Sequence, residues 1–324
     1  MRALLIGGTG FIGPHVARHL TTGGHDVTVF HRGVRRRPAP SDDRDIIGDR
    51  HSLLDSADAL RAARPDVVID LILSSGAQAE DLMHLFRGVA RRVVALSSCD
   101  VYRACGVLHG SEPGGLEPMP LVETSPLRTT GQTYPPEQLA RIRQIFPWVD
   151  AAYDKIPVER AILGAPELPG TVLRLPMVYG PGDPLHRNRA LVTKMDANEP
   201  AIVFEEKYAA WRGPRGFAEN VAAAIVLAAT DERATGNIYN VAEPEALSEL
   251  EWAREVARIA EWRGDVIARP ADDASAKLRM PGNLDQHWIV DSSRIRHELG
   301  YREPVAREEA IRQTIEWERE TRSS

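Results

Sequence analysis

Three glycines near the N-terminus have a spacing that suits the binding of a phosphate group. The segment Gly7-Gly8-Thr9-Gly10-Phe11-Ile12-Gly13 lies between an apolar run and the first helical pattern. Gly7 permits a tight turn, Gly10 lets the backbone approach a pyrophosphate, and Gly13 lets the helix pack closely on the strand. The start of the helix offers free N–H groups and a partial positive charge. The segment therefore predicts a dinucleotide site, in preference to a simple glycine turn.

The end of the second apolar run indicates which dinucleotide is bound. A carboxylate at this place would hold the adenosine ribose of NAD, but the chain reads Phe30-His31-Arg32-Gly33. Arg32 is placed to bind a 2′-phosphate through two hydrogen bonds, which favours NADP over NAD. The arginines at 35–37 are either further phosphate ligands or part of a solvated basic loop. Asp49 is expected to accept a hydrogen bond from the adenine amino group.

The elements that must position these residues alternate between strands and helices, which is typical of a parallel α/β sheet covered by helices on both faces. The predicted strands are residues 3–7, 26–30, 45–47, 66–72, 92–97 and 171–175. The predicted helices are residues 10–22, 52–64 with Ser52 as N-cap, 77–90, 137–163, 217–229, 248–262 and 307–319.

The second half of the chain is expected to form a smaller substrate-binding α/β domain. Residues 99–136 are rich in Gly, Pro and Ser and predict a long loop over the sheet edge. Residues 1–175 form the expected dinucleotide-binding domain, to which 212–241 return, and 176–324 form most of the second domain. Pro147 and Pro157 interrupt the helix predicted at 137–163. Ser248 and Glu251 predict a capping box, and the alanine-rich face of 217–229 predicts close packing on the sheet.

Composition narrows the classes of protein that the chain can be. The 324 residues are 43% hydrophobic and 27% charged, and no apolar run approaches the roughly 18 residues of a membrane helix. Two cysteines, Cys99 and Cys105, are too few for a cysteine zinc cluster, and the start of the chain shows no signal peptide, so no metal and a cytoplasmic location are expected. The net charge of −6 gives no drive towards nucleic acid. Only four lysines occur, at 155, 194, 207 and 277.

Several motifs together resemble the extended short-chain dehydrogenase/reductase family, also described as the NAD-dependent epimerase/dehydratase family. The carriers are residues 7–13, 66–70, the run Leu96-Ser97-Ser98-Cys99-Asp100-Val101-Tyr102, residues 173–183 with their Tyr179-Gly180-Pro181-Gly182 ending, and residues 238–241. The resemblance implies a doubly wound Rossmann domain, a smaller substrate domain, a nucleotide sugar or similar substrate in the cleft between them, and a homodimer. By that resemblance, Pro176 and Val178 lie at the nicotinamide.

The family uses a Ser or Thr, a Tyr, and a Lys four residues after that Tyr. By resemblance Ser98 is the hydroxyl residue, and Lys155, with Glu159 one turn later, is the lysine. The tyrosine is displaced, because Ala151 stands four residues before Lys155. Tyr153 is two residues away, about 200° around a helix, so the two side chains are not expected to act together on one helix. The sequence resembles the atypical branch of the family.

Other groups are therefore candidates for moving the proton. Tyr153 is the first, against ordinary packing, and Asp100 is a candidate general acid if burial raises its pKa. His109 and Tyr134 lie in the long loop and are able to swing over the site, or are simply solvated. Cys99 is expected to be a small buried residue rather than a nucleophile, and Tyr102 is expected to pack at the end of the strand.

The remaining expected ligands fall into two groups. The further cofactor contacts are Thr9, Phe11, Ile12, His31, Arg36, Arg50, Leu71, Ser97 and Lys155. On the substrate side Tyr179, Arg187, Arg189 and Arg215 are expected, with the arginines as clamps for a diphosphate or as surface residues.

The sequence thus favours an enzyme that transfers hydride at a nicotinamide, acting on a nucleotide sugar or a small hydroxylated metabolite as an epimerase, dehydratase or reductase. A second reading is a non-catalytic module that senses NADP(H), because the Tyr–Lys motif is broken. RNA binding is a third reading, weakened by the net charge.

Overall fold

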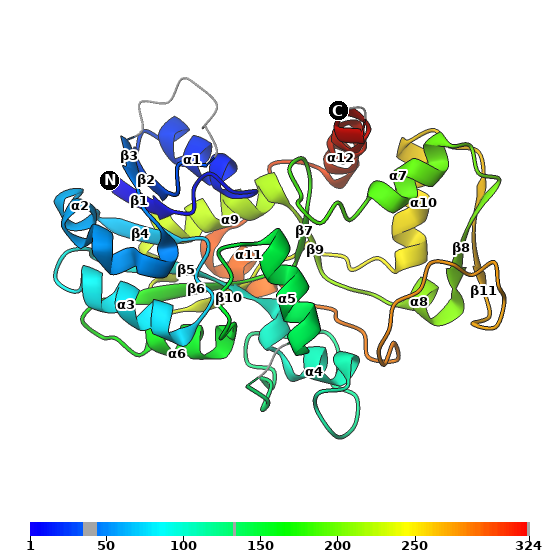
Figure 1. Ribbon diagram of the computed structural model, residues 1–324, viewed down its shortest axis with the longest axis horizontal. Coiled ribbons are helices and arrows are strands. Elements are labelled where there is room, and N and C mark those ends of the chain that lie inside the picture. Colours follow the sequence, from blue (N-terminus) through cyan, green and yellow to red (C-terminus); the bar gives the residue numbers. More distant parts are fainter. Residues whose placement is uncertain (35–43, 132–133, 323–324) are drawn as a thin grey trace.

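The computed structural model describes residues 1–34, 44–131 and 134–322. Its centre is a seven-stranded parallel sheet with the order β10-β6-β5-β4-β1-β2-β3 (Figure 1). The strand order reverses between β1 and β4, and ligands of such sheets bind beside the carboxyl ends of the strands at that point. The predicted α/β fold with a doubly wound sheet is confirmed. The strands are β1 (Arg2–Ile6), β2 (Asp26–His31), β3 (Arg44–Ile47), β4 (Val67–Asp70), β5 (Arg92–Ser98), β6 (Gly170–Leu175) and β10 (Ile238–Asn240).

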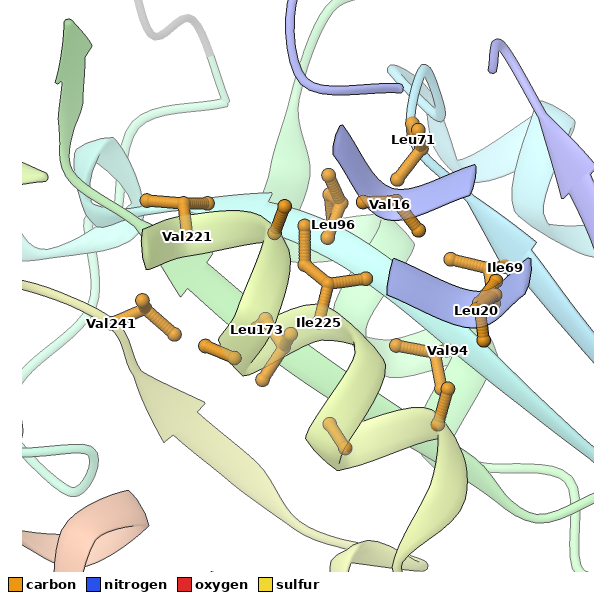
Figure 2. Close-up of a cluster of buried hydrophobic side chains, with 14 of the residues drawn as sticks. Val16, Leu20, Ile69, Leu71, Val94, Leu96, Leu173, Val221, Ile225 and Val241 are labelled. Carbon is orange, nitrogen blue, oxygen red and sulfur yellow. The ribbon is translucent and has the colours of Figure 1, made fainter. Parts of the chain in front are cut away.

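Helices bury both faces of this sheet. Along β1, Ala3 and Leu5 face one apolar cluster while Leu4 and Ile6 face another, because successive side chains of a strand point to opposite faces. On the first face lie α1 (Gly13–Thr22) and α9 (Ala218–Thr230), as Figure 2 shows for side chains from both helices against the strands. On the second face lie α2 (Ala57–Ala62), α3 (Gly76–Phe86) and α6 (Lys155–Leu163). The alanine-rich face of α9 is buried, as predicted.

The later part of the chain forms a separate apolar cluster around Trp252, Ile202 and Ile311. Its short strands pair as β7 with β9 and as β8 with β11. The helix α9 packs on the large sheet and the strand β10 belongs to it, so the chain returns to that sheet before α10. The boundaries of the two predicted domains stay a prediction. These elements are β7 (Met177–Tyr179), α7 (Arg189–Asp196), β8 (Ala201–Glu205), α8 (Glu206–Ala210), β9 (Arg215–Phe217), η3 (Glu232–Ala234), α10 (Glu249–Ile259) and β11 (Asp265–Arg269).

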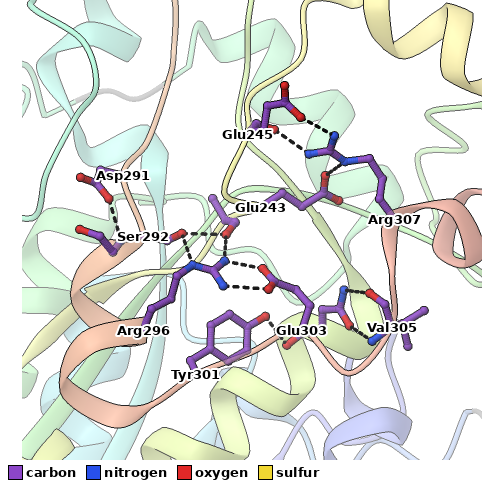
Figure 3. A network of polar contacts seen from close by, with 12 residues as sticks. Glu243, Glu245, Asp291, Ser292, Arg296, Tyr301, Glu303, Val305 and Arg307 are labelled. Carbon is purple, nitrogen blue, oxygen red and sulfur yellow. Dashed lines mark hydrogen bonds and ion pairs between the residues drawn. The ribbon is translucent and has the colours of Figure 1, made fainter.

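Ion pairs fasten the last two helices to the rest of the molecule. The helices are α11 (Ser293–Leu299) and α12 (Arg307–Arg322). Arg296 forms a two-pronged pair with Glu303, and Arg307 pairs with Glu243 and Glu245 (Figure 3). Both arginines have carboxylate partners, so we interpret this network as structural.

Three predicted elements are wrong. The predicted loop 99–136 contains η2 (Cys99–Val101) and α4 (Arg103–His109). The predicted helix 137–163 is two helices, α5 (Pro136–Ile145) and α6, because Pro147 disfavours a helical residue before it and a new helix begins only at Lys155. Ser52 is not an N-cap, since Asp49 caps η1 (Arg50–Ser56) by accepting from the His51 N–H at 2.9 Å.

The predicted capping box of α10 is confirmed, with Ser248 and Glu251 bonded reciprocally. Within the described part of the chain, no helix is long and apolar enough to span a membrane.

Candidate active site

The glycine segment forms a turn that leads directly from β1 into α1. Gly7 has a φ of 85°, and its N–H donates to the Phe30 carbonyl at 3.0 Å. A Cβ on Gly13 would lie 2.4 Å from the Gly8 carbonyl carbon, so only glycine allows the helix to pack there. A Cβ on Gly10 would meet only the Gly7 carbonyl oxygen, at 3.6 Å, within the search distance. The backbone is therefore close-packed at Gly13, where the helix meets the strand, and open at Gly10, which fits the approach of a pyrophosphate to Gly10.

A cavity of about 390 Å³ lies in front of this turn. On its other side are Phe146, Pro147 and Trp148, from the segment after α5, which the sequence analysis missed because a continuous helix was expected there. Of the residues predicted to bind cofactor, those that line the cavity are Gly7, Thr9, Gly10, Phe11, Ile12, Gly13, His31, Arg32, Asp49, Arg50 and Leu71.

The basic residues expected at the adenosine end of the cavity have different surroundings. Arg32 is exposed at the rim, and no described residue pairs with its guanidinium. Arg50 is buried, pairs with Asp70 at 2.9 Å and donates to the Gln78 carbonyl, so its charge is already neutralised. His31 Nδ1 accepts from the Gly33 N–H at 3.0 Å. Arg36 lies outside the described residues.

Tyr153 and Lys155 do not lie on one helix, which corrects the geometry expected from their spacing. Asp154 is the N-cap of α6, with a φ of −157°, and its side chain accepts from the Ile156 N–H. Tyr153 therefore precedes the helix, and the angle of about 200° does not apply. Pro157 is in the first turn of α6, where its missing N–H has no intrahelical acceptor to lose.

A buried carboxyl group joins the two candidate tyrosines. The hydroxyls of Tyr153 and Tyr134 both donate to Asp100 Oδ2, at 2.9 and 3.0 Å. The two rings are stacked with centroids 6.0 Å apart. Asp100 Oδ1 is buried and has no hydrogen-bond partner among the described residues. Burial raises the pKa of Asp100, and burial and the adjacent Asp100 raise the pKa of both tyrosines.

Lys155 lies beside this carboxyl group. Its ammonium donates to the carbonyls of Leu73 and Leu96, the latter at 3.0 Å. Burial lowers its pKa to about 8, although the charge of Asp100 acts in the opposite direction. The rings of Tyr153 and Trp148 cover it, with centroids at 5.8 and 6.0 Å from Nζ.

Arg128 links the segments that carry Asp100, Tyr134 and Lys155. The sequence analysis missed it, because it lies in an irregular segment without a motif. Its guanidinium donates to the main-chain carbonyls of Asp100 at 2.6 Å and Thr130 at 2.8 Å. It also pairs with Asp154, the N-cap of α6, at 2.9 Å. One buried side chain thus links the end of β5, the loop towards Tyr134 and the start of α6.

The remaining residues of the β5 end have separate roles. Ser98 is partly exposed, and its Oγ accepts from the Asp100 N–H at 3.2 Å. Ser97 donates instead to Glu159 at 2.6 Å, and Glu159 forms a two-pronged pair with Arg174. Cys99 is buried with a raised pKa, caused by burial, which suits a packing residue.

Tyr102 was predicted to pack at the strand end, and Pro176 and Val178 were predicted to lie at the nicotinamide. Tyr102, at the end of the same segment, is buried and donates to Asn240 at 2.5 Å. Pro176 and Val178 follow β6, and Val178 is buried in the sheet core.

The substrate-side candidates are all engaged within the protein. Arg187 pairs with Asp183 at 2.8 Å, Arg189 with Glu318 at 2.8 Å, and Arg215 with Glu249 at 2.5 Å. Tyr179 is buried and donates to Glu243 at 2.8 Å. His109 packs edge-on against Tyr134, with ring centroids 6.1 Å apart.

Several known proteins are similar to this chain in sequence or in structure. A curated relative, the 3-diazoavenalumate denitrifying reductase of a Streptomyces species, is 27% identical over 80% of this chain and 81% of its own. Among solved structures, UDP-glucose 4-epimerase of Thermotoga maritima with UDP-glucose is 18% identical, covers 99% of both chains and has a TM-score of 0.68. The dTDP-glucose 4,6-dehydratase of Bacillus anthracis with NAD is 13% identical, covers 100% of this chain and 98% of its own, and has a TM-score of 0.70.

These structural likenesses show the fold. Residues 3–242 match the NAD dependent epimerase/dehydratase family, which confirms the resemblance found in the motifs. The chain belongs to the NAD-dependent epimerase/dehydratase family.

Proposed function

We propose that the protein is an NADP(H)-dependent oxidoreductase in which Asp100, rather than a tyrosine, exchanges the proton with the substrate. The observation that carries the proposal is the unpartnered Oδ1 of Asp100 at the end of β5, beside Ser98 and Lys155. A buried polar atom without a partner is costly, so it indicates a missing group such as a substrate hydroxyl or carbonyl. The substrate is a hydroxyl- or carbonyl-bearing molecule, either a nucleotide sugar or a small metabolite.

The residues around the cavity fit a nicotinamide dinucleotide. The N–H groups at the start of α1 would hold the pyrophosphate, and Arg32 would hold the 2′-phosphate. When bound, the nicotinamide supplies hydride transfer. The relatives with NAD support this class of cofactor, and the exposed guanidinium of Arg32 supports the preference for NADP.

Asp100 is suited to hold a proton that it can give away. Its raised pKa brings the protonated form closer to neutral pH, where a general acid works best. The hydroxyls of Tyr134 and Tyr153 both bond Oδ2, which leaves Oδ1 as the oxygen that carries the proton towards the substrate. Lys155 stabilises the carboxylate that remains after the proton has left, because an ammonium favours a nearby negative charge. Ser98, which is partly exposed, would hold the substrate oxygen.

The first test identifies the nucleotide. The purified protein is denatured, any released nucleotide is identified by absorbance and mass, and NADPH and NADH are titrated. A tightly held nucleotide favours an epimerase or dehydratase, and exchange with solution favours a reductase. Binding of neither nucleotide contradicts the proposal.

Arg32→Asp is expected to shift the preference from NADPH to NADH, since a carboxylate would bond the ribose and repel the phosphate. Arg302→Asp, at an exposed position outside the cavity lining, serves as control. An unchanged ratio of the NADPH and NADH affinities would show that Arg32 does not contact the adenosine end of the nucleotide.

The second test concerns the proton. A panel of aldehydes, ketones and nucleotide sugars is screened with NADPH, and the rate with any substrate found is measured against pH. The reductive rate is expected to fall as pH rises through the raised pKa of Asp100, because the proton donor is lost. Asp100→Asn should lower the rate about 100-fold or more and remove this pH dependence, while the exposed Asp285→Asn changes neither. An Asp100→Asn enzyme with the original rate and pH profile would refute the role, and nucleotide binding without turnover across the panel favours the sensor.

A further inference from the structure

An apolar cluster contacts the backbone at the end of β5 through Trp288. We call it the aromatic wall: Leu108 of α4, Met177 of β7, Trp211, Leu284 and Trp288. Trp211, Leu108 and Leu284 are buried and form its base, whereas Met177 and Trp288 are partly exposed. Four segments that are far apart in the sequence contribute to it, so the tertiary fold assembles it.

The wall is bonded to the residue between Ser98 and Asp100. The indole N–H of Trp288 donates to the carbonyl of Cys99 at 3.2 Å, and Cys99 lies between Ser98 and Asp100. Trp288 also packs against the cluster that contains Cys99 and Ile156 of α6. The partly exposed ring of Trp288 is therefore tied to the segment that carries Ser98 and Asp100.

The two indoles have no polar group left to offer. Trp211 donates its N–H to the Gln286 carbonyl at 3.0 Å, and Trp288 donates its N–H to Cys99. Both rings are thereby fixed in orientation and present only carbon surfaces. Fixed aromatic and thioether surfaces favour stacking and apolar contact over hydrogen bonding to sugar hydroxyls.

The charges around the site do not suit a diphosphate. Arg187, Arg189 and Arg215, the arginines expected as clamps, each have a carboxylate partner. Arg215 and Glu249 are both largely buried, so a diphosphate would have to separate an ion pair that has little access to water. Arg212, next to Trp211, pairs with Glu251 at 2.9 Å.

We propose that the substrate is a small molecule with a planar aromatic group, which stacks on the aromatic wall and places its hydroxyl or carbonyl oxygen at Asp100. This inference rests on the proposed function for the assignment of the reacting end. It selects a small aromatic metabolite over a nucleotide sugar, because the wall offers apolar surface and the arginines expected to bind a diphosphate already have carboxylate partners.

The test uses cinnamyl alcohol as the aromatic probe and UDP-glucose as its rival. Each is titrated by calorimetry into the protein, both alone and with saturating NADP, so that binding at the aromatic wall is measured whether or not nucleotide binds. We expect saturable binding of cinnamyl alcohol and no displacement by UDP-glucose. Trp288→Ala should lower the affinity for cinnamyl alcohol about tenfold, while the affinity for NADPH stays within about twofold of the wild-type value.

Met177→Ala is the second variant, because it removes an exposed part of the wall without touching the Trp288 to Cys99 hydrogen bond. Trp262→Ala, in the other apolar cluster, is the matched control and should leave both affinities unchanged. Binding of UDP-glucose with displacement of cinnamyl alcohol, or an absence of aromatic binding, overturns the inference. Aromatic binding that depends on Trp288 in a protein that binds no nucleotide supports the wall and refutes the proposed function instead.

Discussion

Replacing Lys155 with methionine should change how the stability of the protein depends on pH. Lys155 is 4% exposed, and burial lowers its pKa from an ordinary 10.5 to about 8. Between these two values the unfolded chain binds more protons than the folded protein, so the free energy of unfolding rises with pH. At 1.36 kcal/mol for each pH unit, the full effect is about 3 kcal/mol, present as a penalty at neutral pH and relieved towards pH 10.5.

Urea unfolding of wild type and Lys155→Met at several pH values measures this effect. Raising the pH from about 7 to about 10 should stabilise the wild type by about 2 to 3 kcal/mol relative to the variant. Lost packing or lost hydrogen bonds change the free energy of unfolding of the variant by the same amount at every pH, so they do not produce this dependence on pH. Lys277→Met, at an exposed position, should run parallel to the wild type. A difference between wild type and Lys155→Met that does not vary with pH would refute the buried-ammonium reasoning.

Two further perturbations test the scaffold of the site. Glu159→Gln leaves the buried Arg174 guanidinium without its two-pronged partner, and should lower the free energy of unfolding by about 3 to 5 kcal/mol; a loss below about 1 kcal/mol in urea unfolding would contradict this. Gly13→Ala forces a Cβ to within 2.4 Å of the Gly8 backbone, so NADPH titration should show no binding at concentrations that saturate the wild type. Gly115→Ala, whose Cβ would meet nothing within 4 Å, is the control and should bind NADPH normally.

The fold and the cavity in front of the glycine turn were predictable because both depend on local patterns. The apolar runs, the glycine spacing before α1 and the capping box of α10 each involve residues that are near in sequence. Arg32 was identified in the same way, from its position at the end of a strand. The residues at 146–148 were not, because a break in a helix changes which side chains face the cavity.

The reacting group was harder to predict because its members come from distant segments. The contact between Tyr134 and Asp100 spans 34 residues, and that between Tyr153 and Asp100 spans 53. Neither follows from a spacing rule. Arg128 carries no signal at all in the sequence, since its three partners are two main-chain carbonyls and the carboxylate of Asp154.

The start of α6 explains how an atypical spacing still brings Tyr153 and Lys155 to the buried carboxyl group of Asp100. Because the N-cap Asp154 is extended and the helix begins only at Lys155, Tyr153 lies outside the helix and its ring covers the lysine. Arg128 fixes this arrangement by bonding both Asp154 and the Asp100 carbonyl. The phenol of Tyr153 then donates to a carboxylate, and a phenol that does so is harder to deprotonate. The group best suited to exchange a proton is therefore the carboxyl of Asp100, with the tyrosine as its hydrogen-bond donor.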